Sequence, residues 1–235
     1  MSLQTIIDNA TYLTINKRKG AGVTVSRSGH IKTSVQQGSL YRFTVGAPQG
    51  FKYSENRDLL QQLDDLDVTN ESNVSIGRGK AGLNYLTAYQ GDMTVNSSVA
   101  NTHLLSGVTL NGYSGNELYV DLTGGSGDSG NVSSPTFVVK VGDFIQPEGN
   151  TKTYRYPYQV TSDLQYTGNT SASNITITVN RPILSQDGVS LTSGNLRIGF
   201  GCRYHLICAN MPTYSVVPHD LIEFSDDFEL IERLT

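Results

Sequence analysis

The sequence predicts a mainly β fold built of antiparallel strands, and three observations lead to this prediction. The stretch from Phe137 to Leu184 contains three runs rich in Val, Ile, Thr and aromatic residues, separated by clusters of Gly, Pro, Asn and Ser. Such runs and separators are typical of short strands joined by turns. The chain is also rich in Gly, and only 16% of its residues are charged. Finally, a single segment shows clear helical periodicity, which leaves strands as the main secondary structure.

The first strands are expected within residues 11–47. The runs YLTINKRK, AGVTVSRS and SLYRFTVGAP are separated by Gly20, Gly29 and Gly38, which mark turns. In the second run Val23 and Val25 alternate with polar residues, so one face of this hairpin is apolar over a short length. We expect such a half-covered face to find a neighbour.

A single α-helix is predicted at about residues 54–67. Ser54 is a suitable N-cap, and Glu55 and Asp58 place negative charge in the first turn. The apolar stripe of this helix, which recurs at helical spacing, consists of Leu59, Leu60, Leu63 and Leu66. We interpret the stripe as core that covers a sheet, because a sheet has a face to bury.

The pattern of the remaining segments predicts two structural parts, a main domain and an inserted module. Strands are expected within 104–123, 136–184, 196–210 and 213–224, with a last strand in DDFELIERL. The Gly/Ser-rich stretch GGSGDSGNVSSP at 124–135 is typical of a hinge. We therefore predict a main β-sandwich or barrel domain, residues 1–135 and 185–235, with a flanking helix. A small β-barrel-like module, residues 136–184, is inserted into it.

Charge and hydropathy exclude two classes of partner. The net charge of −4 argues against sequence-specific nucleic-acid binding, which requires clustered Lys and Arg. No run reaches the roughly 18 to 20 consecutive apolar residues of a membrane helix. The first residues, MSLQTIIDNATYL, lack the basic start and apolar block of a signal peptide. We expect a protein made in the cytoplasm, with no membrane partner.

The two cysteines, Cys202 and Cys208, are predicted to be free buried thiols. On an extended strand they lie about 20 Å apart, whereas a disulfide requires α-carbons within about 7 Å. His205 lies midway between them, and strand alternation sends it to the opposite face. We therefore predict no disulfide and no metal site here.

Three motifs suggest enzymes, and each lacks its context. Gly127-Asp128-Ser129-Gly130 matches the string around a serine-protease nucleophile, but neither His30 nor His103 has the setting of the catalytic base. The glycines of 77–82 precede a predicted strand, LNYLTAY, where a dinucleotide-binding loop requires a helix. Candidate carboxylates for a glycosidase pair are Glu117, Asp121, Asp143, Glu148 and Asp163. With no Trp for sugar stacking, we interpret them as solvated carboxylates and predict no enzyme, no cofactor and no metal.

Tyr154, Tyr156 and Tyr158 are the candidate interface residues. They fall on alternate positions, so an extended segment projects all three from one face. Tyrosine gives large contact area at low entropic cost, which favours a subunit interface. Alternation does not say which face is buried, so the core remains an equal alternative.

Three segments resemble structural tail proteins of tailed bacteriophages, in the group of tail-tube, distal-tail and baseplate-hub proteins. They are FKYSENRDLLQQLDDLD, VGDFIQPEGNTKTYRYPYQVTSDL with NRPIL, and NMPTYSVVPHDLIEFSDDFELIE. The resemblance covers most of the chain and lies in texture and segment order. It implies β-sandwich or barrel modules with a flanking helix, assembled as closed rings, commonly hexamers, around the tail lumen.

The resemblance also implies partners and a location. The partners are copies of this chain and other phage tail or baseplate proteins, with DNA at most passing through the lumen. Hairpins such as 12–47 or 196–220 contribute to the ring wall. The expected location is the virion tail, assembled in the host cytoplasm. The alternative expectation is a carbohydrate- or receptor-binding β module of a phage or bacterial surface.

Overall fold

A computed structural model describes residues 2–16, 21–25, 31–35, 40–64, 72–76, 87–96, 103–123, 136–149, 156–167, 171–184 and 191–233. The helices are α1 (Ser2–Asp8), α2 (Tyr53–Asp64) and the 3-10 helix η2 (Gly199–Gly201). The first strands are β1 (Leu13–Asn16), β2 (Ala21–Val25), β3 (Ile31–Val35), β4 (Arg42–Val45), β5 (Ser72–Val74), β6 (Val95–Asn96), β7 (Leu104–Ser114), β8 (Glu117–Leu122) and β9 (Thr136–Val139). The later strands are β10 (Phe144–Glu148), β11 (Tyr158–Gln159), β12 (Leu164–Tyr166), β13 (Ala172–Thr178), β14 (Asn195–Ile198), β15 (Tyr204–Asn210), β16 (Tyr214–Val217), β17 (Leu221–Phe224) and β18 (Phe228–Glu232).

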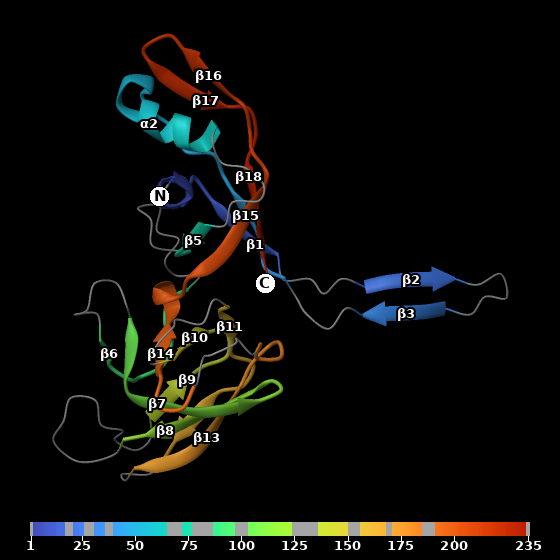
Figure 1. Cartoon of the computed structure of the whole chain (residues 1–235), viewed down its shortest axis with the longest axis vertical. Helices are drawn as coiled ribbons and strands as arrows, with labels where there is room; N and C mark the ends of the chain where they lie inside the picture. Colours follow the sequence, from blue (N-terminus) through green and yellow to red (C-terminus); the bar gives the residue numbers. More distant parts are fainter. Residues whose placement is uncertain are drawn as a thin grey trace. The chain divides into compact units, whose positions relative to one another are not determined.

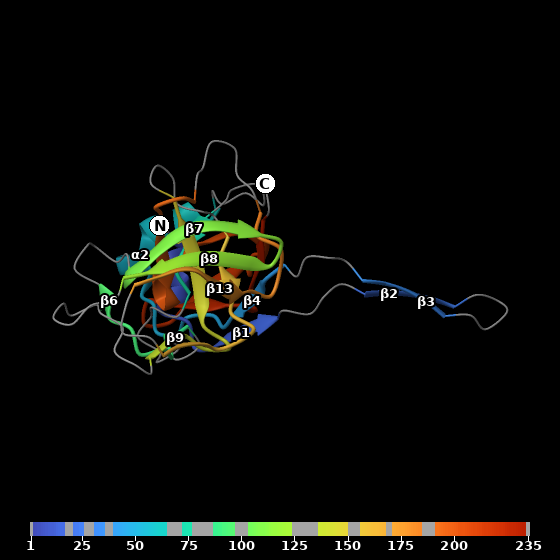
Figure 2. The same cartoon turned by 90° about the horizontal axis from the view of Figure 1, so that it is seen from below.

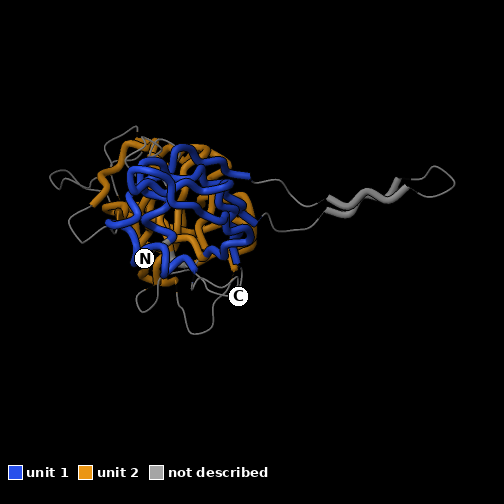
Figure 3. Tube along the Cα trace, turned by 90° about the horizontal axis from the view of Figure 1, so that it is seen from above, with its two compact units in different colours: residues 1–72, 206–235 blue, residues 73–205 orange. Residues whose placement is uncertain are grey.

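The predicted fold class is confirmed, because the chain is mainly β and its sheets are antiparallel (Figure 1). It divides into two compact units. Unit 1 comprises residues 1–72 and 206–235, and unit 2 comprises residues 73–205 (Figure 3). Unit 2 is thus an insertion in unit 1, and the chain passes between them twice.

The inserted part is larger than the predicted module of 136–184, because its strands pair with strands outside those limits. β10 pairs with β14, and β13 pairs with β8, so segments before and after the predicted module belong to the same sheet. The Gly/Ser-rich stretch at 124–135, the predicted hinge, joins two parts of one unit. Its own residues from 124 to 135 lie outside the described part.

Unit 1 is organised around a five-stranded sheet with the order β1-β4-β18-β15-β5. The last strand of the chain, β18, lies between β4 and β15, so both ends of the sequence are tied into one sheet. Alternate residues of these strands point to the core. The buried residues of this core include Tyr41, Phe43, Val45, Leu206, Cys208, Phe228 and Leu230.

Helix α2 begins at Tyr53, one residue before the predicted start, and is described to Asp64; the predicted end, 65–67, lies outside the described residues. Leu60 and Leu63 are buried, as the predicted apolar stripe requires. Burying a leucine side chain contributes about 1.5–3 kcal/mol. Figure 1 shows α2 beside the hairpin β16–β17.

Helix α1 was not expected from the sequence. Its apolar residues Leu3, Ile6 and Ile7 are all buried and fall at the i, i+3 and i+4 spacing of a helix face. The helix is 7 residues long, shorter than the length at which periodicity identifies a helix.

Unit 2 contains a seven-stranded sheet with the path β11-β10-β14-β7-β8-β13, to which β6 adds by pairing with β7. The sheet is curled, and β7 and β8 curve together in Figure 2. Gly112 at the bulge between β7 and β8 has a φ of +147°, a backbone conformation that only glycine adopts readily. The sheet encloses one core, which includes Leu110, Leu118, Val120, Ile145, Tyr156, Tyr158, Ile177, Leu196 and Ile198.

Strands β2 and β3 form a separate two-stranded sheet. Their register pairs Ala21 with Val35, Val23 with Thr33 and Val25 with Ile31. β2 lies within the predicted run 21–28, whereas β3 falls between that run and the next and was not predicted. Among the described strands this hairpin pairs with no third one.

Candidate functional site

The tyrosine stripe predicted as an interface lies in the core of unit 2. Tyr156 is 1% exposed and Tyr158 is fully buried, while Tyr154 lies outside the described residues. The Tyr158 hydroxyl accepts a hydrogen bond from the Leu184 backbone N–H at 2.9 Å. A ring covered by its own chain has no area left for another subunit. The core alternative therefore applies to Tyr156 and Tyr158, which are no longer interface candidates.

Asp143, one of the candidate carboxylates, holds two backbone segments. Its Oδ1 accepts the Gln90 N–H at 2.9 Å, and its Oδ2 accepts the Lys140 N–H at 2.9 Å. Burial raises the pKa of this carboxyl, and the two N–H groups lower it in part. Both oxygens are thus occupied by the backbone of the folded chain.

The other candidate carboxylates also have structural partners. Asp163 accepts the Val141 N–H, and Asp121 accepts the Asn174 N–H. Glu148 forms a bidentate ion pair with Arg197, with N–O distances of 2.8 and 2.9 Å. Glu117 accepts the Tyr119 hydroxyl. The sequence interpretation as solvated carboxylates is therefore wrong for Asp143 and Glu148, which are buried or largely buried and anchor strands of unit 2.

The cysteines are free and buried, as predicted. Burial alternates from Cys202 to Cys208, and His205 falls on the half-exposed positions opposite the thiols. Burial raises the pKa of the Cys208 thiol to about 11 and that of Cys202 further. Among the described residues, no group of His, Cys, Asp and Glu side chains is arranged to hold a metal ion.

The motif that matches a serine protease and the glycine motif that resembles a dinucleotide-binding loop fall outside the described part of the chain. Residues 127–130 and 77–82 belong to segments that the structure does not describe, and so does His30. His103 is described, at a φ of 44°, with its ring edge against Phe200 at 4.3 Å between ring centroids. This histidine packs against an aromatic ring and has no carboxylate partner among the described residues.

A groove of about 480 Å³ lies in unit 1, between the segment 47–50 and strand β17. The lining residues are Ala47, Pro48, Gln49, Gly50, Leu221, Ile222, Glu223 and Phe224. Pro48 and Ile222 are buried and form apolar floor, whereas Glu223 is exposed at the rim. Pro48 and Gly50 disfavour strand pairing between the segment 47–50 and β17. The groove is the space between this segment and β17.

One edge of β17 is open toward this groove. The Ile222 N–H donates to the Phe51 carbonyl at 2.8 Å, on the side away from β16. The Ser225 N–H donates to Thr213, toward the β16 side. Because N–H directions alternate along an antiparallel strand, the N–H and C=O of Phe224 also point away from β16. No hydrogen bond to another described residue satisfies them there.

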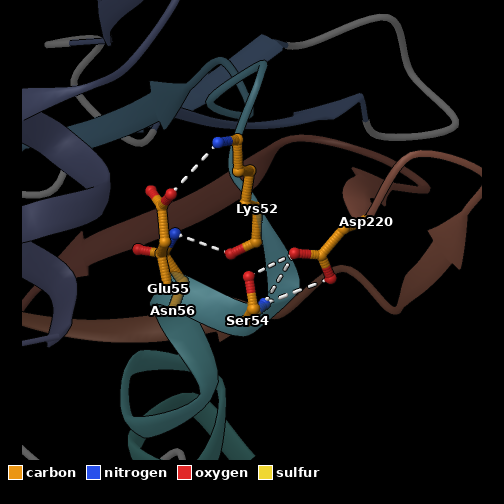
Figure 4. Close-up of polar contacts among 5 residues, drawn as sticks. All are labelled: Lys52, Ser54, Glu55, Asn56 and Asp220. Carbon is orange, nitrogen blue, oxygen red and sulfur yellow. Dashed lines mark hydrogen bonds and ion pairs between the residues drawn. The ribbon is translucent and has the colours of Figure 1, made fainter.

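Asp220, in the turn of the β16–β17 hairpin and next to the groove residue Leu221, binds the start of α2 (Figure 4). Its carbonyl accepts the Tyr53 N–H at 2.7 Å, and its carboxylate accepts the N–H and hydroxyl of Ser54. These are N–H groups of the first turn of α2, which have no partner within the helix. Lys52 pairs with Glu55 at 3.2 Å, and the Asn56 amide donates to the Lys52 carbonyl. These contacts tie the start of α2 to the turn that precedes β17.

Sequence reasoning did not find the groove, because it forms between segments about 170 residues apart. The local signal present in the sequence was the cluster Ala47-Pro48-Gln49-Gly50, which ends strand β4 with turn-forming residues. Ser54 was predicted as the N-cap of the helix. The cap is instead provided by Asp220, from a distant turn.

A second edge in unit 1 is strand β1, which pairs with β4 alone among the strands that the structure describes. Its residues alternate between half-buried and exposed, and the half-buried ones are Leu13 and Ile15. Unpaired edge strands are sites where another chain can add. Within the described part of unit 1, partners are thus missing along one side of β1 and at the Phe224 end of β17.

No helix among the described residues has the length and apolar character needed to cross a bilayer. A comparison with models of protein families finds none that matches this chain, and a comparison with curated proteins finds no similar sequence.

Proposed function

We propose that this protein is a non-enzymatic structural subunit that forms a closed ring in a phage tail or baseplate hub, around the DNA channel. The observation that carries the proposal is the groove beside β17, where the strand edge at Phe224 has no partner among the described residues and adjoins an apolar floor. Open edges are normally blocked in monomers and are the sites at which chains join. The tail setting rests on the resemblance of segments 51–67, 141–164 and 210–232 to phage tail proteins.

The described carboxylates support a structural role. Asp143, Glu148 and Asp163 bind backbone N–H groups or an arginine within unit 2. A general acid or base needs a free oxygen directed at a substrate. These groups instead fasten turns and strands of the scaffold.

The net charge of −4 is compatible with a channel through which DNA passes, since like charges disfavour binding to phosphates. The alternative of a carbohydrate- or receptor-binding module relied mainly on an exposed tyrosine face. Burial of Tyr156 and Tyr158 removes that support for the described residues.

Negative-stain electron microscopy and sedimentation of the purified protein test the proposal. The expected result is a ring of several copies, at high protein concentration or when tail proteins are added. Mass spectrometry of purified phage particles tests the location. A protein that never assembles and is absent from particles contradicts the proposal.

A further inference from the structure

Strand β17 has room for a further strand beside Phe224. On the side away from β16, the Ile222 N–H donates to the Phe51 carbonyl at 2.8 Å, and the pairing there is antiparallel. This pairing ends where the chain turns away at Gly50, whose φ is +75°. The N–H and C=O of Phe224 lie past that point and have no hydrogen-bond partner among the described residues. The edge therefore offers one donor and one acceptor where a strand would continue.

The groove beside this edge can hold a short piece of extended chain. Its volume is about 480 Å³, and ligand sites in proteins typically measure roughly 300–1,000 Å³. Because side chains alternate along a strand, a guest residue opposite Phe224 shares the face of Ile222, and its neighbour shares the face of Glu223. Ile222 and Pro48 are buried and form the apolar floor. The guest residue opposite Phe224 is therefore a large apolar one.

The rim of the groove is acidic. Glu223 lines it and is exposed, and Asp226 and Asp227 follow β17. The ion pairs among the described residues do not include these three carboxylates. Lys52, close in sequence to the groove segment, is paired with Glu55 at 3.2 Å. The charge of the rim thus favours a cationic guest.

An exposed tyrosine extends this rim. Tyr12 is 45% exposed, and its hydroxyl donates to the carboxylate of Asp227. The Tyr12 ring lies against Gly46, where a Cβ atom would collide with it, and Gly46 precedes the groove residue Ala47. A tyrosine ring beside a carboxylate attracts a guanidinium or ammonium group. This is a second reason to expect basic side chains in the guest.

We propose that the groove binds an extended peptide segment of a different protein, in which a large apolar residue lies between two basic residues. The apolar residue pairs with Phe224 in antiparallel register, exchanges two backbone hydrogen bonds with it, and covers Ile222 and Pro48. One basic residue faces Glu223, and the other extends toward Asp227. This chain contains no large apolar residue between two Lys or Arg residues, which favours a different protein as the source. The inference rests on the proposed function, which takes the groove as a site of assembly, and names its partner.

A fluorescent peptide of sequence Thr-Lys-Val-Lys-Thr tests the site by fluorescence anisotropy. We expect saturable binding, and we expect hydrogen exchange of the Phe224 amide, followed by NMR, to slow about tenfold in the bound protein. The peptide Thr-Lys-Pro-Lys-Thr is the matched control, because proline lacks the N–H that donates to the Phe224 carbonyl. We expect it to bind about tenfold more weakly.

Glu223→Gln tests the electrostatic part. Removing this exposed carboxylate is expected to weaken binding of Thr-Lys-Val-Lys-Thr about threefold at low salt. Glu229→Gln is the matched control, because Glu229 is an exposed carboxylate of β18 that does not line the groove. We expect this control to leave the affinity unchanged. Circular dichroism checks that both variants are folded.

The outcomes separate this site from the ring. If the two peptides bind equally, or exchange at Phe224 is unaffected, the peptide site is wrong. If the wild-type protein forms rings but binds no peptide, the ring stands and the peptide site is again wrong. If the peptide binds at Phe224 but the protein neither assembles nor occurs in particles, the site stands and the ring fails. If self-association alone protects the Phe224 amide, a second copy occupies the groove, and the proposal of a different protein is overturned.

Discussion

Asp220 caps helix α2 from 166 residues along the chain: its carboxylate accepts the backbone N–H of Ser54 at 3.2 Å, in the first turn of α2. Asp220 has a φ of 64°, and its neighbour His219 has a φ of 73°. Non-glycine residues in this left-handed region are strained, although Asp and Asn tolerate it better than most. The contacts of Asp220 with Tyr53 and Ser54 hold the turn in this conformation.

Asp220→Ala is expected to destabilise the protein by about 1–2 kcal/mol, because the helix loses its cap while the strained turn remains. Asp220→Asn is the matched control. It keeps an acceptor oxygen and tolerates the positive φ, so we expect less than half of that loss. Urea unfolding followed by circular dichroism measures both. Equal stability of the alanine variant and the wild-type protein would show that the cap contributes nothing.

Asp143→Asn is expected to cost about 1–3 kcal/mol, although it changes one atom. The two carboxylate oxygens accept different N–H groups, those of Gln90 and Lys140, and an amide offers one oxygen only. Its NH₂ group then faces a backbone N–H. The same substitution at Asp163 is the control, because one oxygen of this exposed residue accepts one N–H, from Val141. We expect a change below about 0.5 kcal/mol there, and similar losses at both sites would contradict this account.

The strands could be predicted from the sequence because their signals are local. Runs such as LTIN, ELYVDL and FELIE contain β-formers between turn residues, and each forms a strand close to the expected place. The helix at 53–64 was equally local. The partners of the strands could not be predicted in this way, since pairing of β10 with β14 depends on residues about 50 positions apart. For this reason the inserted unit is larger than the predicted module.

The candidate site could not be predicted either, because it also depends on contacts between residues far apart in the sequence. Alternation of Tyr156 and Tyr158 correctly indicated a shared face, but burial depends on what the rest of the sheet places against that face. The sequence around Asp143 indicates a surface carboxylate, because the contact with the Gln90 backbone exists only in the folded chain. The groove forms only when the 47–50 segment meets β17.

Removing one partner of the ion pair between Arg197 and Glu148 is expected to be costly. The side chains are only 11% and 19% exposed, and Glu148→Gln leaves a guanidinium with little access to water. We expect a loss of about 2–4 kcal/mol, which the double variant Arg197→Met/Glu148→Leu recovers in part, because it removes both charges. Thermal unfolding in low and in 0.5 M salt measures these changes, where 0.5 M is a condition of roughly 4–5 Å screening length. A loss that disappears in salt would indicate a surface pair instead.

We expect the free energy of unfolding to fall at alkaline pH because of the buried Cys208 thiol. Burial raises its pKa in the folded state to about 11, so the folded state holds the proton that the unfolded chain releases. Stability from this group is complete below the unfolded pKa and falls as pH rises above it. Urea unfolding at pH 7, 8, 9 and about 10 measures the slope. Cys208→Ala is expected to reduce the slope, and Cys202, whose pKa is raised in the same direction, accounts for part of the remainder.

Tyr158→Phe separates a core role from an interface role for the tyrosine stripe. The substitution keeps the ring and its contact with the Arg181 guanidinium, 5.3 Å from the ring centroid, but removes the oxygen that accepts the Leu184 N–H. We expect a loss of about 0.5–1.5 kcal/mol in unfolding free energy, with assembly unchanged once the protein is folded. Tyr119→Phe, whose hydroxyl donates to Glu117 near the surface, is the control and is expected to change stability little. A Tyr158→Phe variant that assembled more weakly at unchanged stability would contradict this account. The aromatic side chain of residue 158 would then have to leave the core of unit 2 when the subunits assemble.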